Sequence, residues 1–362
     1  RIASVLSEKA TQMHSFRALQ QKAALESACI GTIDAFCIDF IRDNFERAGV
    51  TPDFKIASKE QLAVTESRVL DQVIERFMIS EPDCFRKTAA FLGAEYGAGN
   101  LSKAVHRVYS YTRSIAFPDT WLDDVCEMYA PHEHFSDTIW SDALFGYAFD
   151  TADFNYAALT VALNSIDDEA LYTAYSPALT YHRSVLGEIR TAARDKDYMR
   201  IHTLTSQFSA VDLKRVKTDS AELREHLKSV NDAAKKAIAK IGERFGADEA
   251  ECMNDTDNAG YCVRVIAKLV KAYSSALYEE KKQSNTFSFS DIEHMTLELL
   301  CEQSDGEIMV KDSGMSTRFK EVLVDEYQDT NDLQDAIFYA LSDRGKNLFL
   351  VGDVKQSIYR FR

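Results

Sequence analysis

The sequence predicts an α/β domain, built as a doubly wound sheet, whose chain is interrupted by a large helical insertion. Strand-like segments occur near the start and near the end of the chain, and residues 58–282 between them have an almost wholly helical pattern. Only five prolines and fourteen glycines occur in 362 residues, which is typical of a mainly helical protein. Because distant strands can join one sheet, we expect the two outer pieces to belong together.

The length and composition predict more than one globular domain. A chain of 362 residues exceeds one ordinary core, and 46% of the residues are apolar. No apolar run is long enough to span a membrane and no signal peptide opens the chain, so we expect no membrane partner. The chain starts at Arg1 without an initiator Met, which predicts an internal piece of a longer protein.

The cysteines and the net charge restrict the function further. Seven cysteines are scattered and never form a C-x-x-C pair, which favours reduced thiols in the cytoplasm over disulfides or zinc. The net charge of −15 argues against broad binding to polyanions. Local contact with a nucleic acid through stacking remains compatible with this charge.

The first 57 residues predict two helices and a strand. Residues Ile2–Leu25 have apolar or small residues at helical spacing without Gly or Pro, so we expect one helix there. Ala28–Thr32 predicts a short strand that ends in a polar turn. Phe36–Phe45 predicts a second helix, which Gly49 and Pro52 bring to an end.

The region from about residue 58 to residue 282 predicts a helical domain. Amphipathic periodicity is clear over Glu60–Phe77, Ala221–Phe245 and Tyr261–Tyr278. We interpret these stretches as ordinary core helices with one apolar face.

The last forty residues contain two predicted strands that each end in polar groups. Val322–Val324 is followed by Asp325 and Glu326, and Asn347–Val351 is followed by Gly352-Asp353 and then Gln356. The carboxyl ends of parallel strands build ligand sites at one edge of a sheet. One carboxylate of the pair can hold Mg²⁺, while its neighbour orients or deprotonates a water that attacks phosphate.

The acidic pair also has a structural interpretation, because carboxylates are stabilised at helix N-termini. Asp329 and Thr330 could cap a helix over Asn331–Leu341 in this way. Capping does not explain two carboxylates directly after a buried-type strand, where desolvation is costly without a cation. We therefore favour a metal–nucleotide site.

Two further features lie after the second strand. The amide of Gln356 could reach a terminal phosphate or the attacking water, since it both donates and accepts hydrogen bonds. Tyr359 and Phe361 alternate with Arg360 and Arg362. Such a pattern suits stacking on single-stranded bases with phosphate contacts, and it equally suits an amphipathic edge with core aromatics.

The residues around these strands resemble motifs II and III of superfamily 1A helicases, the UvrD, Rep and RecB group. The matching segments are Val324–Asn331, reading VDEYQDTN, and Gly352–Arg362, reading GDVKQSIYRFR. Within the group the sequence is most similar to the AddA family of helicase–nuclease subunits. That similarity rests on the second segment together with FSDIEH at 289–294 and GTIDAFC at 31–37.

The resemblance is specific over residues 28–57 and 285–362. The family usually has Thr-Ile-His-Ser-Phe-Cys where this chain has Thr-Ile-Asp-Ala-Phe-Cys, so Asp34 and Ala35 depart from it. This departure argues against a direct DNA contact by Asp34. Asp291 falls in a family motif to which we assign a structural or coupling role.

The resemblance implies a P-loop NTPase fold of the RecA-like type. Residues 1–57 and 283–362 would be parts of motor domain 1A, and residues 58–282 would be the inserted, mainly helical domain 1B. Together they would form a partial motor domain.

The resemblance also implies roles for single residues around ATP and Mg²⁺. Asp325 would coordinate the metal, and Glu326 beside it would be the general base for water attacking the γ-phosphate. Gln356 would contact that phosphate and couple it to the DNA site.

A DNA strand would be contacted by two groups of residues under the same resemblance. Thr32 and Phe36 would line its path, and Tyr359 and Phe361 would stack on bases beside Arg362. The implied partners are single-stranded DNA, duplex DNA ends and an AddB-like subunit.

The sequence contains no G-x-x-x-x-G-K-[ST] loop to cradle phosphates. The resemblance places that loop before residue 1, and the second motor domain, arginine finger and nuclease domain after Arg362. We therefore expect this chain alone not to hydrolyse ATP. Two alternatives remain: a UvrD- or Rep-type helicase without a nuclease, and a non-catalytic helicase-like module whose acidic helical domain binds a partner protein.

Overall fold

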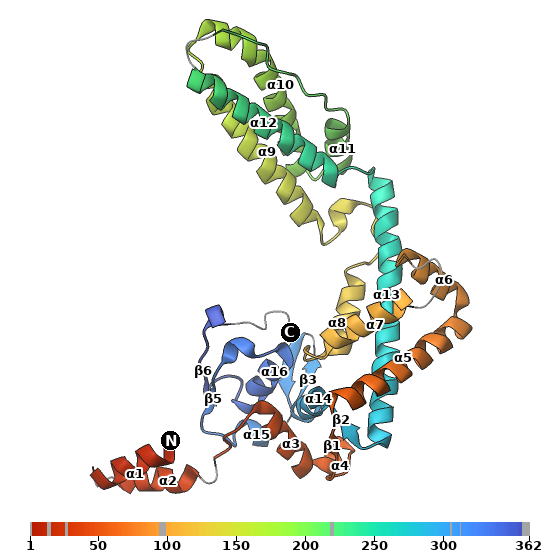
Figure 1. The fold of residues 1–362 in the computed structure, drawn as a ribbon, viewed down its shortest axis with the longest axis vertical. Coiled ribbons are helices and arrows are strands. Elements are labelled where there is room, and N and C mark those ends of the chain that lie inside the picture. The colour runs from red at the N-terminus through yellow and green to blue at the C-terminus, as the bar shows by residue number, and fades with distance from the viewer. Residues whose placement is uncertain are drawn as a thin grey trace. The chain divides into compact units, whose positions relative to one another are not determined.

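The chain folds into two compact units in a computed structural model (Figure 1). Unit 1 comprises Arg1–Leu122 and Ile266–Arg362, and unit 2 comprises Asp123–Val265. The structure describes residues 2–12, 16–25, 28–93, 99–217, 221–304, 306–311 and 313–356. Unit 2 lies within the stretch 58–282 that we predicted to be the helical insertion.

Unit 1 is mainly helical. Its helices are α1 (Ile2–Gln12), α2 (Phe16–Ala24), α3 (Ile33–Asp43), α4 (Phe45–Ala48), α5 (Lys59–Ser80), α6 (Pro82–Phe91), α7 (Gly99–Thr112), α14 (Phe289–Leu300), α15 (Ser313–Ser316) and α16 (Asp332–Leu341). Two 3₁₀ turns, η3 (Tyr327–Asp329) and η4 (Val354–Gln356), follow strands. Two further helices, α8 (Pro118–Glu127) and α13 (Glu249–Gln283), run across the sequence boundaries of the units.

The strands of unit 1 form three pairs among the described residues. β1 (Lys55–Ile56) pairs in parallel with β2 (Thr286–Phe287), β3 (Cys301–Ser304) antiparallel with β4 (Glu307–Val310), and β5 (Val322–Val324) in parallel with β6 (Leu348–Leu350). The β1–β2 pair joins residues from the two sides of the predicted insertion. The two outer pieces thus share a strand pairing, whereas one continuous doubly wound sheet stays a prediction.

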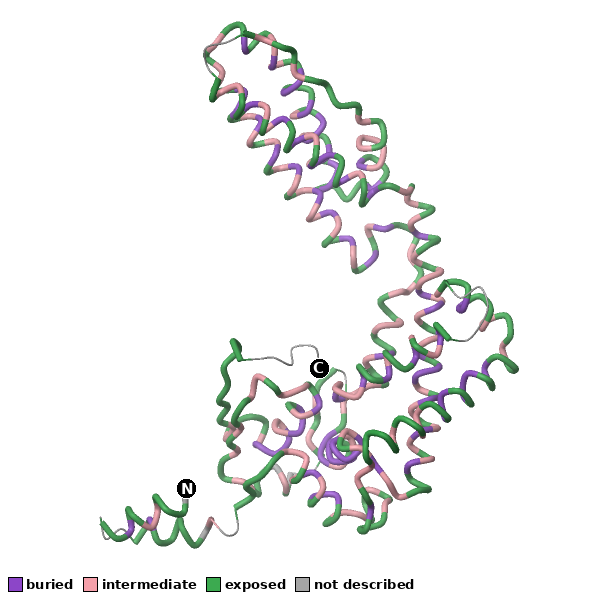
Figure 2. Tube along the Cα trace, in the orientation of Figure 1, coloured by how far each residue is buried: buried purple, intermediate pink, exposed green. Residues whose placement is uncertain are grey.

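The core of unit 1 lies where α14 packs against α3 and α16. Helix α14 is buried along most of its length (Figure 2), because Ile292, Leu297 and Leu300 face neighbouring helices and each is at most 1% exposed. Its first turn is fixed by a capping box, in which Ser288 and Asp291 bond each other's backbone N–H groups. This helix is therefore the most firmly held element near the predicted site.

Most predicted elements are present, with three corrections. The region Ile2–Leu25 contains two helices, since α1 ends at Gln12 and α2 packs back on it, which buries Ala10 and Ala18. Residues 28–32 form no strand; the Thr32 hydroxyl instead accepts the Ala35 N–H at 3.2 Å and caps α3.

The third correction concerns the helix after the acidic pair. The N-cap of α16 is Asn331, whose side chain accepts the N–H of Gln334 at 2.8 Å, and not Asp329 or Thr330. An Asn in extended conformation directly before the first helical residue is well placed for this bond.

Unit 2 is helical. Its long helices α9 (Ser141–Asn164), α10 (Glu169–Arg194) and α12 (Ala221–Arg244) lie side by side, with the shorter α11 (Tyr198–Ser206) and the 3₁₀ turn η2 (Phe135–Asp137) against them (Figure 1). The buried ring of His182 accepts the Val211 N–H at 3.1 Å and bonds Asn231 at 2.8 Å, which fastens the extended segment after α11 to the bundle. Burial lowers the pKa of His182.

Two negative findings apply to the described residues. No helix there is both long and apolar enough to cross a membrane. All seven cysteines lie in this part of the chain, and none of them forms a disulfide.

Candidate nucleotide site

Strands β5 and β6 bring the two predicted polar loops to one edge. The strands run parallel with Val324 opposite Leu350. The pairing continues beyond them, because the Val351 N–H donates to the Val324 carbonyl at 2.8 Å and the Tyr327 N–H donates to the Val351 carbonyl at 2.9 Å. Both loops therefore leave the same end of the pair, as the sequence predicted.

Gln328 joins the two loops through its side chain. Its Oε1 accepts the N–H of Asp353 at 2.9 Å, and its Nε2 donates to the carboxylate of Glu326. A Cβ on Gly352 would lie 2.8 Å from Gln328 Oε1 and 3.1 Å from the Gln328 backbone nitrogen, so any larger residue would have to displace the Gln328 amide from this position. We did not single out Gln328 from the sequence; its position two residues after the acidic pair was the available signal.

Asp325 and Glu326 are exposed carboxylates. Neither is paired with a Lys or Arg in the described part of the chain, and Asp325 Oδ1 accepts the N–H of Glu326 at 3.0 Å. Glu326 has a left-handed backbone, with φ of 52°, which is uncommon for a residue with a side chain and occurs often at functional sites.

The expectation that this pair is desolvated is wrong. The strand behind it is itself only half-buried, since Leu323 is 69% exposed and Phe349 of the neighbouring strand is 60% exposed. The carboxylates are thus open to solvent and to a cationic ligand.

Gln356 lies at the end of η4 and is held by its own loop. Its Nε2 donates to Asp353 Oδ2 at 3.2 Å, and its N–H donates to the Asp353 carbonyl at 2.8 Å. No hydrogen bond among the described residues joins Gln356 to Asp325 or Glu326. Its connection to the acidic pair is indirect, from Asp353 through Gln328 to Glu326.

The acidic pair suits a magnesium–nucleotide complex better than a protein-only metal site. The described residues bring no three His, Cys, Asp or Glu side chains together as metal ligands. Mg²⁺ needs only one or two carboxylates when phosphates and water complete its shell. Two open carboxylates without a competing cation fit that requirement.

The predicted DNA-contacting residues are only partly described. Thr32 is exposed at the N-terminus of α3, where its hydroxyl accepts the capping bond. Phe36 is half-buried and stacks on Phe40, with the edge of Phe319 against it, so it also serves the core. Tyr359, Phe361 and Arg362 lie outside the described residues.

A layer of buried polar side chains lies on α14, which packs against α16. Asp291 is 6% exposed and accepts bonds from Arg113 at 2.9 Å and Lys281 at 2.8 Å. Burial opposes ionisation of Asp291, but Arg113 and Lys281 outweigh it and hold its pKa below the ordinary value.

Glu293, on the next part of α14, is buried in a different setting. Its carboxylate accepts a hydrogen bond from the Gln334 amide at 2.7 Å, and it forms no ion pair with a Lys or Arg among the described residues. Burial raises the pKa of Glu293 to about 7. Two carboxylates of one helix thus have opposite electrostatic environments.

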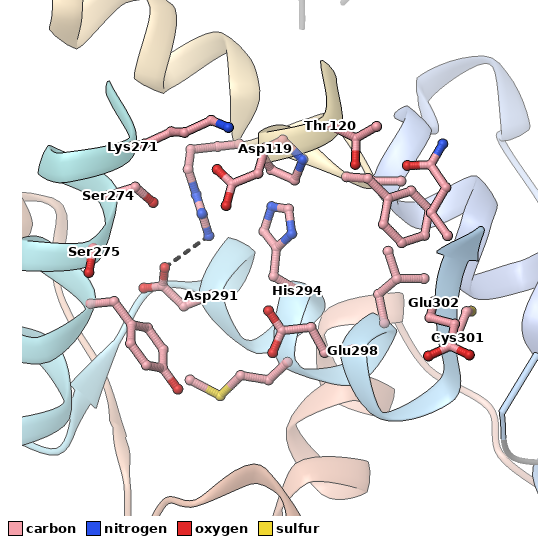
Figure 3. Close-up of a pocket in the computed structure, with 18 of the residues that line it drawn as sticks. Asp119, Thr120, Lys271, Ser274, Ser275, Asp291, His294, Glu298, Cys301 and Glu302 are labelled. Atoms are coloured by element: carbon pink, nitrogen blue, oxygen red, sulfur yellow. Dashed lines mark hydrogen bonds and ion pairs between the residues drawn. The ribbon is translucent and has the colours of Figure 1, made fainter. Parts of the chain in front are cut away.

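A cavity of about 630 Å³ lies beside this layer, between α7, α13, α14 and β3 (Figure 3). His294 lines it, and burial lowers the pKa of that imidazole to about 3. None of the predicted site residues that the structure describes lines this cavity. The candidate site is the open edge of β5 and β6.

Comparison with known proteins gives consistent results. The model of the UvrD/REP helicase N-terminal domain matches residues 1–362. The AddA subunit of the ATP-dependent helicase/nuclease of Moorella thermoacetica is 31% identical over 361 residues, which cover 95% of this chain and 25% of that protein. The same-named protein of Acetivibrio thermocellus is 30% identical over 377 residues, covering 100% of this chain and 30% of its own length.

A third relative, from Pelotomaculum thermopropionicum, has the same name and is 28% identical over 354 residues, covering 95% of this chain and 28% of its own length. The predicted resemblance to the AddA family is confirmed by these relatives. The chain spans less than a third of the length of each of the three.

Proposed function

Because the chain belongs to the UvrD/REP helicase N-terminal domain family, we propose that it is the first motor region of an ATP-dependent DNA helicase/nuclease. The family implies a P-loop NTPase fold and dependence on ATP. Under this proposal, residues 1–57 and 283–362 belong to a RecA-like domain 1A, and residues 58–282 form the inserted domain 1B. The full-length protein would process DNA ends in the cytoplasm together with an AddB-like subunit.

One observation carries the proposal: β5 and β6 present an open acidic pair and a Gln-bearing loop at one edge. When bound, Mg²⁺-ATP supplies a γ-phosphate that water can attack. Asp325 would hold the metal, and Glu326 would accept the proton of the attacking water. Gln328 would keep the Glu326 carboxylate oriented through its amide, and Gln356 would contact the phosphate from the adjoining loop.

DNA contacts are proposed for the residues predicted from the sequence. Thr32 and Phe36 would line the path of a single strand, and Tyr359, Phe361 and Arg362 would meet its bases and phosphates. Binding of DNA by these residues would require the rest of the full-length protein.

The experiment is Glu326→Gln in the full-length protein. We expect DNA-stimulated ATP hydrolysis to fall by roughly 10²-fold or more, since loss of a general base has effects of this size. ATP binding should persist, because the isosteric amide leaves Asp325 in place. Unchanged DNA-stimulated hydrolysis would show that Glu326 is not the base.

A second candidate function is supported by the charge of unit 2. Residues 123–182 include many Asp and Glu but no Lys or Arg, which suits a basic protein partner better than DNA. In that case the chain would be a helicase-like binding module without turnover. A full-length protein without ATPase activity under any DNA condition would favour this alternative.

A further inference from the structure

A short connector between α7 and α8, residues Arg113–Ala116, bridges two helices of unit 1. On one side, Arg113 bonds Asp291 at 2.9 Å and Ser290 at 3.0 Å, both in the first turn of α14. On the other side, the Ala116 N–H donates to Asp332 Oδ2 at 2.8 Å, and the Ser114 carbonyl accepts the Leu333 N–H at 3.1 Å. The connector therefore holds the N-terminus of α16 in place.

From Asp332, hydrogen bonds continue to the acidic pair. One turn along α16, Asp335 accepts the hydroxyl of Tyr327 at 2.6 Å. Within the 3₁₀ turn, the Asp329 N–H donates to the Glu326 carbonyl at 3.0 Å. A shift of α16 would thus move the backbone that places Glu326.

The opposite end of the connector is tied to α13. Lys281 of that helix bonds the other oxygen of Asp291 at 2.8 Å, so Asp291 binds both α7 and α13 to α14. Along the chain, α8 leads into unit 2 and α13 returns from it. Helix α14 packs in turn against α3, at whose N-terminus the proposed DNA contacts Thr32 and Phe36 lie.

The connector borders a cavity on one side. Arg113 lines the cavity of about 630 Å³, where its bond to Asp291 is drawn near Ser274 and Ser275 of α13 (Figure 3). The guanidinium side chain is 21% exposed, whereas Asp291 is 6% exposed. The Arg113 side chain thus borders open space on the side away from the apolar core.

We propose that Asp332 is a positioning residue, through which the connector Arg113–Ala116 couples DNA binding to ATP turnover. The inference rests on the proposed function. Asp332 does not need to touch nucleotide or DNA; its bond to Ala116 holds the first turn of α16, which is bonded through Asp335 to Tyr327 beside Glu326.

The test compares Asp332→Ala with Asp332→Asn in the full-length protein. ATP hydrolysis is measured with and without a single-stranded oligonucleotide, over a range of ATP concentrations. We expect Asp332→Ala to reduce the DNA-stimulated kcat by roughly 5- to 100-fold, the usual span of coupling effects, and the basal kcat by a clearly smaller factor, with KM for ATP within about twofold. Asp332→Asn should restore stimulation, because its amide oxygen can still accept the Ala116 N–H.

The matched control is Glu280→Ala. Glu280 forms an ion pair with Arg68 that joins α13 to α5, and it contacts neither α14 nor α16 through any described ion pair. We expect this variant to keep the wild-type stimulation. If Asp332→Ala leaves stimulation unchanged, or lowers basal and stimulated rates in parallel with the melting temperature, the coupling role is wrong.

The two proposals fail in different ways. Absence of DNA-stimulated hydrolysis in the wild-type protein overturns the proposed function, and its persistence in Glu326→Gln overturns the role proposed for Glu326. Normal stimulation in wild type and in Asp332→Ala overturns only the coupling role.

Discussion

Two acidic sites less than forty residues apart in sequence differ in almost every physical respect. Asp325 and Glu326 are exposed and have no cationic partner in the described chain, whereas Asp291 is buried between Arg113 and Lys281. A buried charge is tolerated only when partners compensate its desolvation, so the Asp291 carboxylate has a structural role and is not free for a ligand. The exposed carboxylates of Asp325 and Glu326 have no such partners in the described chain and can bind a ligand.

The comparison teaches how to separate structural from functional carboxylates in this chain. The first part of α14 is fixed by bonds from Ser288, Arg113 and Lys281 to one side chain. The acidic loop is instead shaped by its own backbone and by Gln328. The Asp291 carboxylate is thus used up by partners in the fold, whereas the carboxylates of the acidic loop remain open to a ligand.

The largest stability effect is expected at the buried site. Asp291→Ala would leave Arg113 and Lys281 without their shared anion, and breaking such a buried pair costs about 3–5 kcal/mol. Asp325→Ala, at the exposed site, should change stability by less than about 1 kcal/mol. Amide hydrogen exchange of α14 in the full-length protein measures both, since it reports local opening free energies.

The comparison fails if the two variants have similar exchange in α14. Equal protection in wild type and Asp291→Ala would mean that the three-way ion network adds no net stability. A large loss of protection in Asp325→Ala would mean that the acidic loop is part of the rigid layer.

Local sequence patterns predicted the elements with strong periodicity. The strand Val322–Val324 has the predicted bounds, and helices cover the three stretches predicted between residues 58 and 282. These segments were predictable because the spacing of apolar residues is a local property of each segment. The break between α1 and α2 was missed because an uninterrupted helical pattern does not reveal where a chain turns back on itself.

The geometry of the site was predictable only in outline. The motif placed Asp325, Glu326 and Gln356 at strand ends, but their exposure depends on how many strands flank β5 and β6. The pairing of Asp291 with Arg113, 178 residues away in sequence, leaves no local signal. Gln328 was missed because its role appears only when both loops are in place.

A smaller effect is expected from Glu293 and it depends on pH. Its folded pKa of about 7 lies above the ordinary value of 4.5, so the unfolded chain releases the proton first. The stability contribution is therefore complete below about pH 4.5 and is lost as the pH rises to 7, by up to about 3 kcal/mol. Glu293→Gln should remove this decline, while its amide oxygen can still accept the Gln334 bond.

Urea unfolding between pH 5 and pH 8, monitored by amide hydrogen exchange in α14, tests whether stability falls as the pH rises. The wild-type protein should lose protection of the α14 amides across this pH range. Glu293→Gln should lose clearly less, with a residual decline from Glu298, whose pKa burial also raises. Glu302→Gln is the control, since that exposed carboxylate lies just after the same helix and pairs with Lys311 at the surface. An identical slope in wild type and Glu293→Gln would rule out titration of Glu293 in this window.

The smallest effect on stability is expected at Gln328, which belongs to the exposed acidic loop. Gln328→Ala removes the bridge between Glu326 and the Asp353 N–H, at a cost of about 0.5–1.5 kcal/mol for each bond of this kind. Because the bridge lies in the open loop, global stability should hardly change. DNA-stimulated kcat should fall by less than about tenfold, since Glu326 remains present but less well oriented.

Gln328→Glu should lower DNA-stimulated kcat more than Gln328→Ala does, because it places a second negative charge beside Glu326. Steady-state kinetics of the full-length protein test both variants, and a wild-type kcat in each would mean that Gln328 does not orient Glu326.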